Sequence, residues 1–519
     1  MRDNVPRSYL SIVLVMSVML ELLFLGIVNA QYDTPIPDDG PTSLPWYIGE
    51  PAKPHPLRPS GAPQNPFMML NPWNNVHNDP WMSDTYMIAG PLGREPAILS
   101  SRLETARRNP ASPMFDCGCI TFDSRGRIVA TCIGLGEASL VLLDPLSLKV
   151  LTYLHLPVNA DPAAAYGSAY MYLDDRDRAV VTVTDHIWVV GQMGPTDSPT
   201  FEAPIDYDLS GVVPLGDSIQ SVMPDWEGRL WFATRKSGLV GVLEPTTGAV
   251  LGTRQLNEEI GNSFAMTTDA AYVVTTKAMY RLAAGPDGIP YVVWQSKPYK
   301  NVGFKKDGQL TAGSGTSPTI LDKGKYVAIT DNAEHMHVVV YRTEVGLPPE
   351  ERVVCEVPVF EPGLGATEDS LIGLGRSLIV ANEYGYRLEF DEVNNRFKST
   401  PTEPGVARVD IDANGKGCQV VWTNEALAAP QVGPKMSTKN GLVYLFTRKY
   451  DQAVMGYGPN GLDVYYWTAV DFRTGETVWE RRVGTGPLFD GYVPGPAIGP
   501  TGTLYVGPYG GIIAMWDTP

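Results

Sequence analysis

The chain of 519 residues has 44% hydrophobic and 19% charged residues, with 52 glycines and 45 prolines. This composition is typical of a folded protein built from many short strands and turns, and it argues against disorder away from the ends. The formal net charge of −17 at pH 7 repels phosphate backbones and anionic lipids. We therefore expect no nucleic-acid partner and no peripheral attachment to a membrane.

The first 30 residues are predicted to be a signal peptide. Arg2 and Arg7 precede or flank the start of the apolar run YLSIVLVMSVMLELLFLGIV, and Val28-Asn29-Ala30 supplies small residues for cleavage. A basic start, an apolar run and a small-residue end are typical of a cleavable signal. The run is nearly long enough to span a bilayer, so an uncleaved anchor is the alternative. We expect a secreted or periplasmic protein that has no membrane contact after cleavage.

Residues 31–83 are predicted to form a proline-rich arm. The segment QYDTPIPDDGPTSLPWYIGEPAKPHPLRPSGAPQNPF has little hydrophobic periodicity, which is typical of an extended linker. From about residue 84 the pattern changes to short apolar strands separated by Gly, Asp and Asn turns. We therefore predict one β-rich domain over residues 84–519.

The chain has five cysteines: Cys117, Cys119, Cys132, Cys355 and Cys418. Cys119 and Cys132 flank a predicted hairpin that would place them opposite each other on adjacent strands. We predict a Cys119–Cys132 disulfide, with Cys117 as the alternative partner of Cys132. The odd count leaves at least one cysteine unpaired within the chain.

One pattern recurs every 40–60 residues or so: a polar start, a strand, a tight turn with Gly or Asp, and a second β-rich strand. A second half with two further strands follows several copies, as in 140–156 and 240–256. Four strands per repeat are the signature of a β-propeller blade. We predict an all-β, eight-bladed β-propeller, with seven blades as the alternative. The copies lie at 119–131, 169–183, 218–234, 262–276, 316–330, 369–382, 433–447 and 495–508.

The last copy ends after its third strand, which would leave an open sheet edge. The segment before the first copy, around 84–99, is the natural donor of the missing strand. We therefore predict that an N-terminal strand closes the ring.

The sequence AVDFRTGETVW (469–479) matches the A-x-D-x-x-T-G-x-x-x-W blade motif of quinoprotein-type propellers. The segment PAIGPTGTLYVGPYGGIIAMWD (496–517) also resembles a repeat of the pyrroloquinoline-quinone (PQQ) repeat class. This resemblance to the quinoprotein alcohol dehydrogenase-like superfamily implies a propeller fold. The dehydrogenases of this class have adjacent cysteines near the quinone, whereas this chain has Cys117-Gly118-Cys119. The sequence therefore does not support a PQQ site residue by residue.

Topology predicts which residues meet at the channel of such a ring. The starts of first strands and the loops between second and third strands share one face, where we expect a small-molecule or polymer ligand to bind. The residues predicted to contact this ligand are Asp185, His186, Gln220, Arg235, Asn262, Asp331, Asn332, Asn382, Tyr384, Arg448 and Tyr450.

The loop DNAEHMH (331–337) holds two of the six histidines. On a strand, His335 and His337 would face the same side, and with Asp331 they would form a mixed nitrogen and oxygen site for a divalent metal. A histidine beside a carboxylate would instead act as a general base, and a purely structural loop is the third interpretation. For catalysis without metal, the candidate residues are His335, His337, Glu368, Asp369 and Glu383.

The sequence DIDANG (410–415) resembles the start of an EF-hand loop. Position twelve of that loop would be Val421 rather than glutamate, so a β-turn between two strands is predicted.

The leading functional prediction is ligand binding at the channel mouth. The alternatives are a metal- or histidine-assisted hydrolase or lyase, a quinoprotein-like oxidoreductase, and a scaffold that binds another protein. No sequence motif names the substrate.

Overall fold

The structure is a computed structural model that describes residues 34–108, 115–134, 136–158, 167–196, 198–391, 396–457, 460–492 and 495–519. The predicted signal peptide, residues 1–30, lies outside the described residues. Within the described ranges no helix has the length and apolar character needed to cross a membrane. Residues 34–519 form one compact unit.

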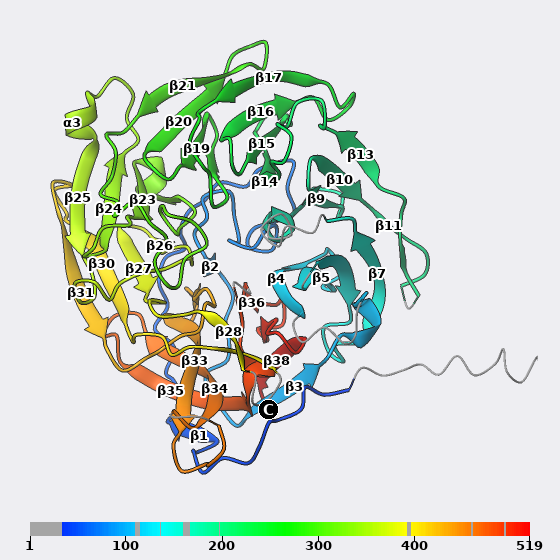
Figure 1. The fold of residues 1–519 in the computed structure, drawn as a ribbon, viewed down its shortest axis with the longest axis vertical. Helices are drawn as coiled ribbons and strands as arrows, with labels where there is room; N and C mark the ends of the chain where they lie inside the picture. The colour runs from blue at the N-terminus through cyan, green and yellow to red at the C-terminus, as the bar shows by residue number, and fades with distance from the viewer. Residues whose placement is uncertain are drawn as a thin grey trace, which may run out of the picture. The chain divides into compact units, whose positions relative to one another are not determined.

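Eight antiparallel sheets follow one another along the chain and form a closed ring (Figure 1). Each sheet is one blade of a β-propeller, and we number the blades in chain order. Blade one consists of β4 (Phe115–Phe122), β5 (Ile128–Gly134), β6 (Glu137–Leu143) and β7 (Val150–Leu156), and blade two of β8 (Tyr172–Leu173), β9 (Ala179–Val183), β10 (His186–Val190) and β13 (Ile205–Asp208). Blade three consists of β14 (Ile219–Pro224), β15 (Leu230–Thr234), β16 (Leu239–Leu243) and β17 (Val250–Gln255), and blade four of β18 (Ala265–Thr267), β19 (Ala270–Val274), β20 (Met279–Ala284) and β21 (Pro290–Gln295).

Blades five to eight complete the ring, so the eight-bladed prediction is confirmed. Blade five consists of β22 (Thr319–Leu321), β23 (Tyr326–Thr330), β24 (His337–Arg342) and β25 (Val353–Pro358), and blade six of β26 (Ile372–Leu374), β27 (Ser377–Ala381), β30 (Val406–Ile411) and β31 (Cys418–Asn424). Blade seven consists of β32 (Lys435–Ser437), β33 (Leu442–Asp451), β34 (Leu462–Asp471) and β35 (Thr477–Thr485), and blade eight of β36 (Ala497–Ile498), β37 (Leu504–Val506), β38 (Ile512–Asp517) and β3 (Pro96–Ser101).

Shorter elements decorate this ring. Two hairpins, β11 (Gln192–Met193) with β12 (Thr200–Phe201) and β28 (Leu388–Asp391) with β29 (Arg396–Ser399), lie within blades two and six along the chain. The helical turns are η1 (Glu104–Ala106), η2 (Ser168–Tyr170), η3 (Asp322–Gly324), α3 (Pro349–Arg352) and η4 (Pro487–Phe489).

The predicted closure of the ring is confirmed. Strand β3 pairs antiparallel with β38, from Pro96 opposite Asp517 to Ser101 opposite Ile512. The chain before the first repeat thus supplies the outermost strand of the eighth blade, slightly later in the sequence than 84–99.

The stacking of blades explains the hydrophobic pattern. Strand β27, with the sequence SLIVA, is buried at every position because neighbouring blades cover both of its faces. The outermost strand β17 is half-buried in its first half and exposed in its second. Continuous apolar runs therefore mark the middle strands of the blades.

Several turns between first and second strands share one device. The carboxylate of Asp225 accepts backbone N–H groups from Glu227 and Arg229, at 2.9 and 3.0 Å, and its second oxygen accepts from the Arg229 side chain at 2.7 Å. Asp123 and Arg127 repeat this arrangement in blade one. The repeated Asp and Arg of the sequence therefore fix the turn that joins the two strands.

The described part of the N-terminal arm lies along the ring. Strand β1 (Tyr47–Gly49) pairs with the outer strand β35, and β2 (Thr85–Tyr86) pairs in parallel with the inner strand β32. Backbone carbonyls of Pro80, Trp81 and Ser83 accept N–H groups from the first strands of blades four, five and six. Figure 1 shows β2 near the centre of the ring. Residues 80–86 therefore cover the inner edges of four successive blades.

The Cys119–Cys132 prediction is wrong, because Cys132 is bonded to its alternative partner, Cys117. A register shift between Cys117 and Cys119 places Cys117 opposite Cys132 and Cys119 opposite Thr131. Such a bulge displaces every later residue of the strand relative to its partner. Cys119 is a buried free thiol.

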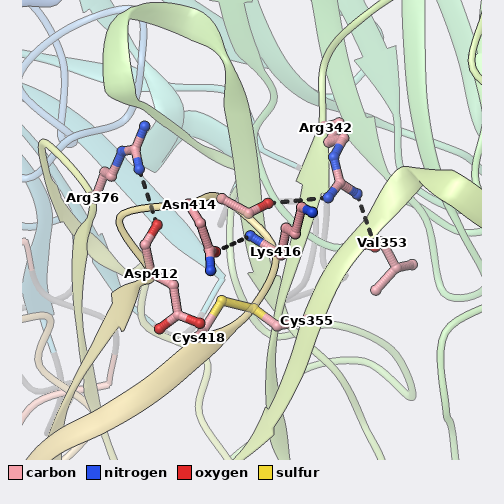
Figure 2. Close-up of a disulfide and its surroundings, with 9 residues drawn as sticks. Arg342, Val353, Cys355, Arg376, Asp412, Asn414, Lys416 and Cys418 are labelled. Atoms are coloured by element: carbon pink, nitrogen blue, oxygen red, sulfur yellow. Dashed lines mark hydrogen bonds between the residues drawn. A yellow bond between two sulfur atoms is a disulfide. The ribbon is translucent and has the colours of Figure 1, made fainter.

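A second disulfide joins Cys355 on β25 to Cys418 on β31, so it connects the outer strands of blades five and six. Figure 2 shows this bond close to the turn that contains Asp412 and Asn414. The Gly415 N–H donates to the Asp412 carbonyl at 2.9 Å. The predicted β-turn at DIDANG is therefore confirmed.

Candidate functional site

A small cavity lies in the channel where several first strands begin. Its volume is about 40 Å³, which is room for a few water molecules. Three of the predicted residues, Gln220, Glu368 and Asp369, contribute to its wall. The other lining residues are Val76, His77, Asp84, Gly118, Ala169, Tyr170, Leu310, Ser370, Gly433, Pro434, Lys435 and Gly495.

A buried charged network forms one side of this cavity. The Lys435 ammonium group donates to a carboxylate oxygen of Asp84 and to the Val76 carbonyl. The His77 Nδ1 atom lies 3.2 Å from both Asp84 oxygens. Burial opposes ionisation of Asp84, but Lys435 and His77 outweigh it and lower the pKa of this carboxyl. Asp84 is therefore an ionised carboxylate held between two basic groups.

The far side of His77 is held by hydroxyl groups. Its Nε2 atom lies 3.3 Å from the Ser317 hydroxyl oxygen, which lies 2.8 Å from the Ser263 hydroxyl oxygen. The Tyr170 ring stacks on His77 at 6.1 Å, and the Tyr170 hydroxyl donates to Asn262 at 3.0 Å. These contacts fix the imidazole plane in the wall of the cavity.

On the other side, Glu368 and Asp369 of blade six line the cavity, and Glu383 bonds to Glu368 without lining the cavity. One oxygen of Glu368 accepts the Leu310 N–H at 2.8 Å, and Glu383 accepts the Glu368 N–H at 2.7 Å. Burial raises the pKa of Glu368 to about 8 and that of Asp369 to about 6. Burial and then the charge of Asp369 raise the pKa of Glu383 well above its usual range. Burial therefore favours the protonated forms of Glu368 and Glu383, and Asp369 is the most acidic of the three.

The DNAEHMH loop lies outside this cavity. The Asp331 carboxylate accepts the His337 N–H at 2.8 Å and lies 2.9 Å from His337 Nδ1. The His335 Nε2 atom lies 2.9 Å from the Phe360 carbonyl oxygen. Over the ranges that the structure describes, no three His, Cys, Asp or Glu side chains form a group that could hold a metal ion. His337 instead closes this loop on its own Asp331, and His335 joins the loop to the chain at Phe360.

The remaining predicted ligand contacts do not line the cavity either. His186 lies 2.8 Å from Asp206 and 3.7 Å from Asp185, and Arg235 pairs with Glu259 at 3.6 Å. Asn332 and Asn382 donate to backbone carbonyls of Phe304 and Leu364. Tyr384 donates its N–H to Asn382, and Arg448 lies 5.3 Å from the Tyr450 ring while it pairs with Asp490.

His77 and Asp84 were not among the residues predicted from the sequence, since both fall at the end of or just after the segment interpreted as a linker. The stretch NPWNNVHNDPWMSDTY (71–86) is rich in Asn, Asp and Trp, unlike the proline-rich sequence before it. That change of composition was the available signal for a folded segment.

No family model matches the chain. An uncharacterized protein of Archaeoglobus fulgidus is 29% identical over 346 residues, which are 59% of this chain and 64% of that protein. This chain thus spans less than two thirds of the relative.

Among solved structures, BamB from Moraxella catarrhalis is similar with a TM-score of 0.31 and 15% identity, over 66% of this chain and 97% of that one. The β-propeller domain of Cps50 (Swd1) from Myceliophteria thermophila has a TM-score of 0.37 and 9% identity, over 79% and 97%. The assignment of this chain as an eight-bladed β-propeller rests on its own eight blade sheets.

Proposed function

We propose that this protein is a secreted or periplasmic β-propeller that binds a small polar ligand, or a polar group of a polymer, at the channel cavity. The observation that carries the proposal is the meeting of His77, Asp84 and Lys435 with Glu368 and Asp369 around one buried space. Convergent polar groups with shifted pKa values in a concave site are the usual mark of a binding or catalytic site.

The cavity also limits what enters. With about 40 Å³, it admits a group of a few heavy atoms, while the rest of the ligand stays outside. Protonated Glu368 donates a hydrogen bond, and ionised Asp84 and Asp369 accept. A hydroxyl or ammonium group matches this set of donors and acceptors, whereas a carboxylate would be repelled by Asp369, and Lys435 is already paired with Asp84.

The test is a binding measurement by calorimetry with ethanolamine as the probe and propionate as the anionic comparison. We expect ethanolamine alone to bind, and Glu368→Gln to change its affinity several-fold because the proton on Glu368 becomes fixed as an amide. Glu361→Gln removes an exposed carboxylate that follows β25 of blade five and should leave the affinity unchanged. Equal affinities for both variants, or equal binding of propionate, would contradict the proposal.

Export rests on the N-terminal pattern and is supported by two disulfides among the described cysteines, which are typical of oxidising compartments. Protein recovered from the medium or periplasm should begin at Gln31. A full-length chain retained in the membrane would overturn this part of the proposal.

Acid–base catalysis is a second candidate function, favoured by the different pKa values of Glu368 and Asp369, about 8 and about 6. Two carboxyl groups whose environments separate their pKa values provide an acid and a base together. Turnover of a glycoside or ester substrate should then follow a bell-shaped pH profile with limbs near these values. Loss of the upper limb in Glu368→Gln would support the assignment, and an unchanged profile would refute it.

A further inference from the structure

A second, larger cavity lies between blades four and five, at the strand ends opposite to those that form the channel site. It is bounded by the turn from β18 to β19, by η3 and by the chain after β24, with the N-terminal arm on one side. Its volume is about 290 Å³, close to the lower end of the range for small-molecule sites. The lining residues are Pro63, Trp81, Thr267, Thr268, Asp269, Tyr272, Arg281, Lys323, Gly324, Thr343, Glu344 and Val345.

The wall of this second cavity, called the groove from here on, contains buried hydrogen-bond donors. The Arg281 side chain is 8% exposed, lies 5.9 Å over the Tyr272 ring and pairs with Asp269. The Arg281 Nε and the Trp81 Nε1 atoms are both buried without a hydrogen-bond partner among the described residues. Buried unsatisfied donors are rare in proteins, and a partner that brings acceptor oxygens would relieve their cost.

The buried charges of this groove are positive, although its rim carries both signs. Arg281 lines the groove, and Arg352, which does not line it, is almost fully buried and close enough to Arg281 for their charges to oppose each other. The Asp269 side chain is 65% exposed, and Glu344 on the rim is also exposed. Water and salt screen exposed charges more than buried ones. The interior of the groove is therefore a positive site on a protein whose net charge is −17.

Lys323 adds a further cation at the rim. It is exposed, lies in η3 with φ of 60°, and has no ion-pair partner among the described residues. Lys325, two residues later, is exposed too but does not line the groove and lies 3.9 Å from Asp322. The chain thus offers a matched pair of lysines, of which only one faces the groove.

We infer that this groove is a second binding site, independent of the channel, for a small polar molecule that bears one carboxylate. The carboxylate would accept hydrogen bonds from the Arg281 guanidinium group and lie within reach of the Lys323 ammonium group. Charge-assisted bonds between a guanidinium and a carboxylate are among the strongest hydrogen bonds in proteins. Thr268 provides a hydroxyl group for the uncharged part of the ligand, and the Thr267 and Thr343 hydroxyls, which already donate to Asp269 and Gly324, can accept from it.

The experiment follows the Trp81 signal by ¹⁹F NMR in protein labelled with 5-fluorotryptophan, with the resonance assigned through Trp81→Phe. The carboxylate occurs on both sugar acids and peptide ends, so glucuronate and N-acetylalanine are titrated separately. Glucose and N-acetylalaninamide are their neutral counterparts. We expect a saturable shift of the Trp81 signal with at least one acid and none with its neutral counterpart, and the acid that binds identifies the source.

Variants then locate the carboxylate. Arg281→Gln should weaken binding about tenfold or more, the loss that a charged hydrogen bond implies. Because Arg281 is buried, that variant can fail to fold, and Lys323→Gln against Lys325→Gln supplies the second test. Lys323→Gln should weaken binding several-fold and Lys325→Gln should not, while Glu368→Gln in the channel should have no effect.

Three results would overturn the inference: no saturable shift of the Trp81 signal with either acid, equal shifts with the acids and their neutral counterparts, or equal affinities for the two lysine variants. Failure here would leave the channel site untouched, because the two cavities share no lining residue.

Discussion

The channel and the outer surface of the ring both contain lysine–carboxylate pairs, but the two pairs differ in burial. Lys435 and Asp84 each have side chains that are 3% exposed. Lys300 and Glu356, on the outside, are 54% and 33% exposed and 2.6 Å apart. Water replaces a lost partner at the surface, whereas in the channel the remaining charge is stranded. Loss of one partner should therefore cost much stability in the channel and little at the surface.

Breaking the channel pair should give the largest effect. Lys435→Met leaves the Asp84 carboxylate buried with only His77 as a basic neighbour, and we expect the free energy of unfolding to fall by about 3–5 kcal/mol. Denaturant unfolding measures this change. Lys439→Met, at an exposed site four residues later, is the control. If Lys435→Met costs no more than that control, the stranded-charge explanation is wrong.

The disulfide on the outer strands should come next. Replacing Cys355 and Cys418 by serine removes a link that closes a 63-residue separation, and we expect a loss of about 2–4 kcal/mol. Guanidinium unfolding measures the loss. Binding at the channel should be unchanged, because both cysteines lie on outermost strands. A variant with normal stability but altered channel binding would contradict both of these expectations.

Titration of Glu368 should make the free energy of unfolding depend on pH. Its folded pKa of about 8 lies above the usual 4.5, so unfolding releases a proton between these values. The contribution of Glu368 is therefore fully present below about pH 4.5 and is lost as pH rises to about 8, at about 1.4 kcal/mol per pH unit.

Glu368→Gln should remove this part of the slope, so that the variant gains stability relative to the native protein as pH rises. Unfolding at pH 5, 6.5 and 8 measures it, with Glu361→Gln as the exposed control. Parallel pH curves for the native protein and Glu368→Gln would show that Glu368 does not titrate in this window.

The surface pair should give the smallest effect. Lys300→Met should change the free energy of unfolding by less than about 1 kcal/mol, and added salt should reduce even that difference. Thermal unfolding at low and high salt measures it. A cost comparable with that of Lys435→Met would remove the distinction between the two regions.

The ring itself could be predicted from sequence because its signals are local. The turn residues Asp225 and Arg229 lie four positions apart, and the same spacing recurs with Asp123 and Arg127. The missing strand of the last repeat likewise required a donor, and the chain before the first repeat was the nearest. Local repetition therefore contained most of the fold.

The candidate site was predictable only in part. Glu368 and Asp369 followed from their place at the start of a first strand, but His77 and Asp84 reach the channel through an arm that crosses several blades. No local pattern encodes such a path. The composition of DNAEHMH suggested a metal or catalytic site, yet Asp331 and Phe360 already bond the two histidines. The bulge between Cys117 and Cys119 could not be predicted from the sequence either, and this bulge places Cys117 rather than Cys119 opposite Cys132.

The closure of the eighth blade also sets the order of events during synthesis. The Leu92 N–H donates to the Asp517 carboxylate, a partner 425 residues further along the chain. Strand β3 is therefore synthesised long before its partner β38. Its backbone N–H and C=O groups stay unpaired and accessible to other chains for most of elongation. Contacts between such distant residues also slow folding. A factor that shields one open strand edge during this interval would raise the yield of the folded protein without altering its final stability.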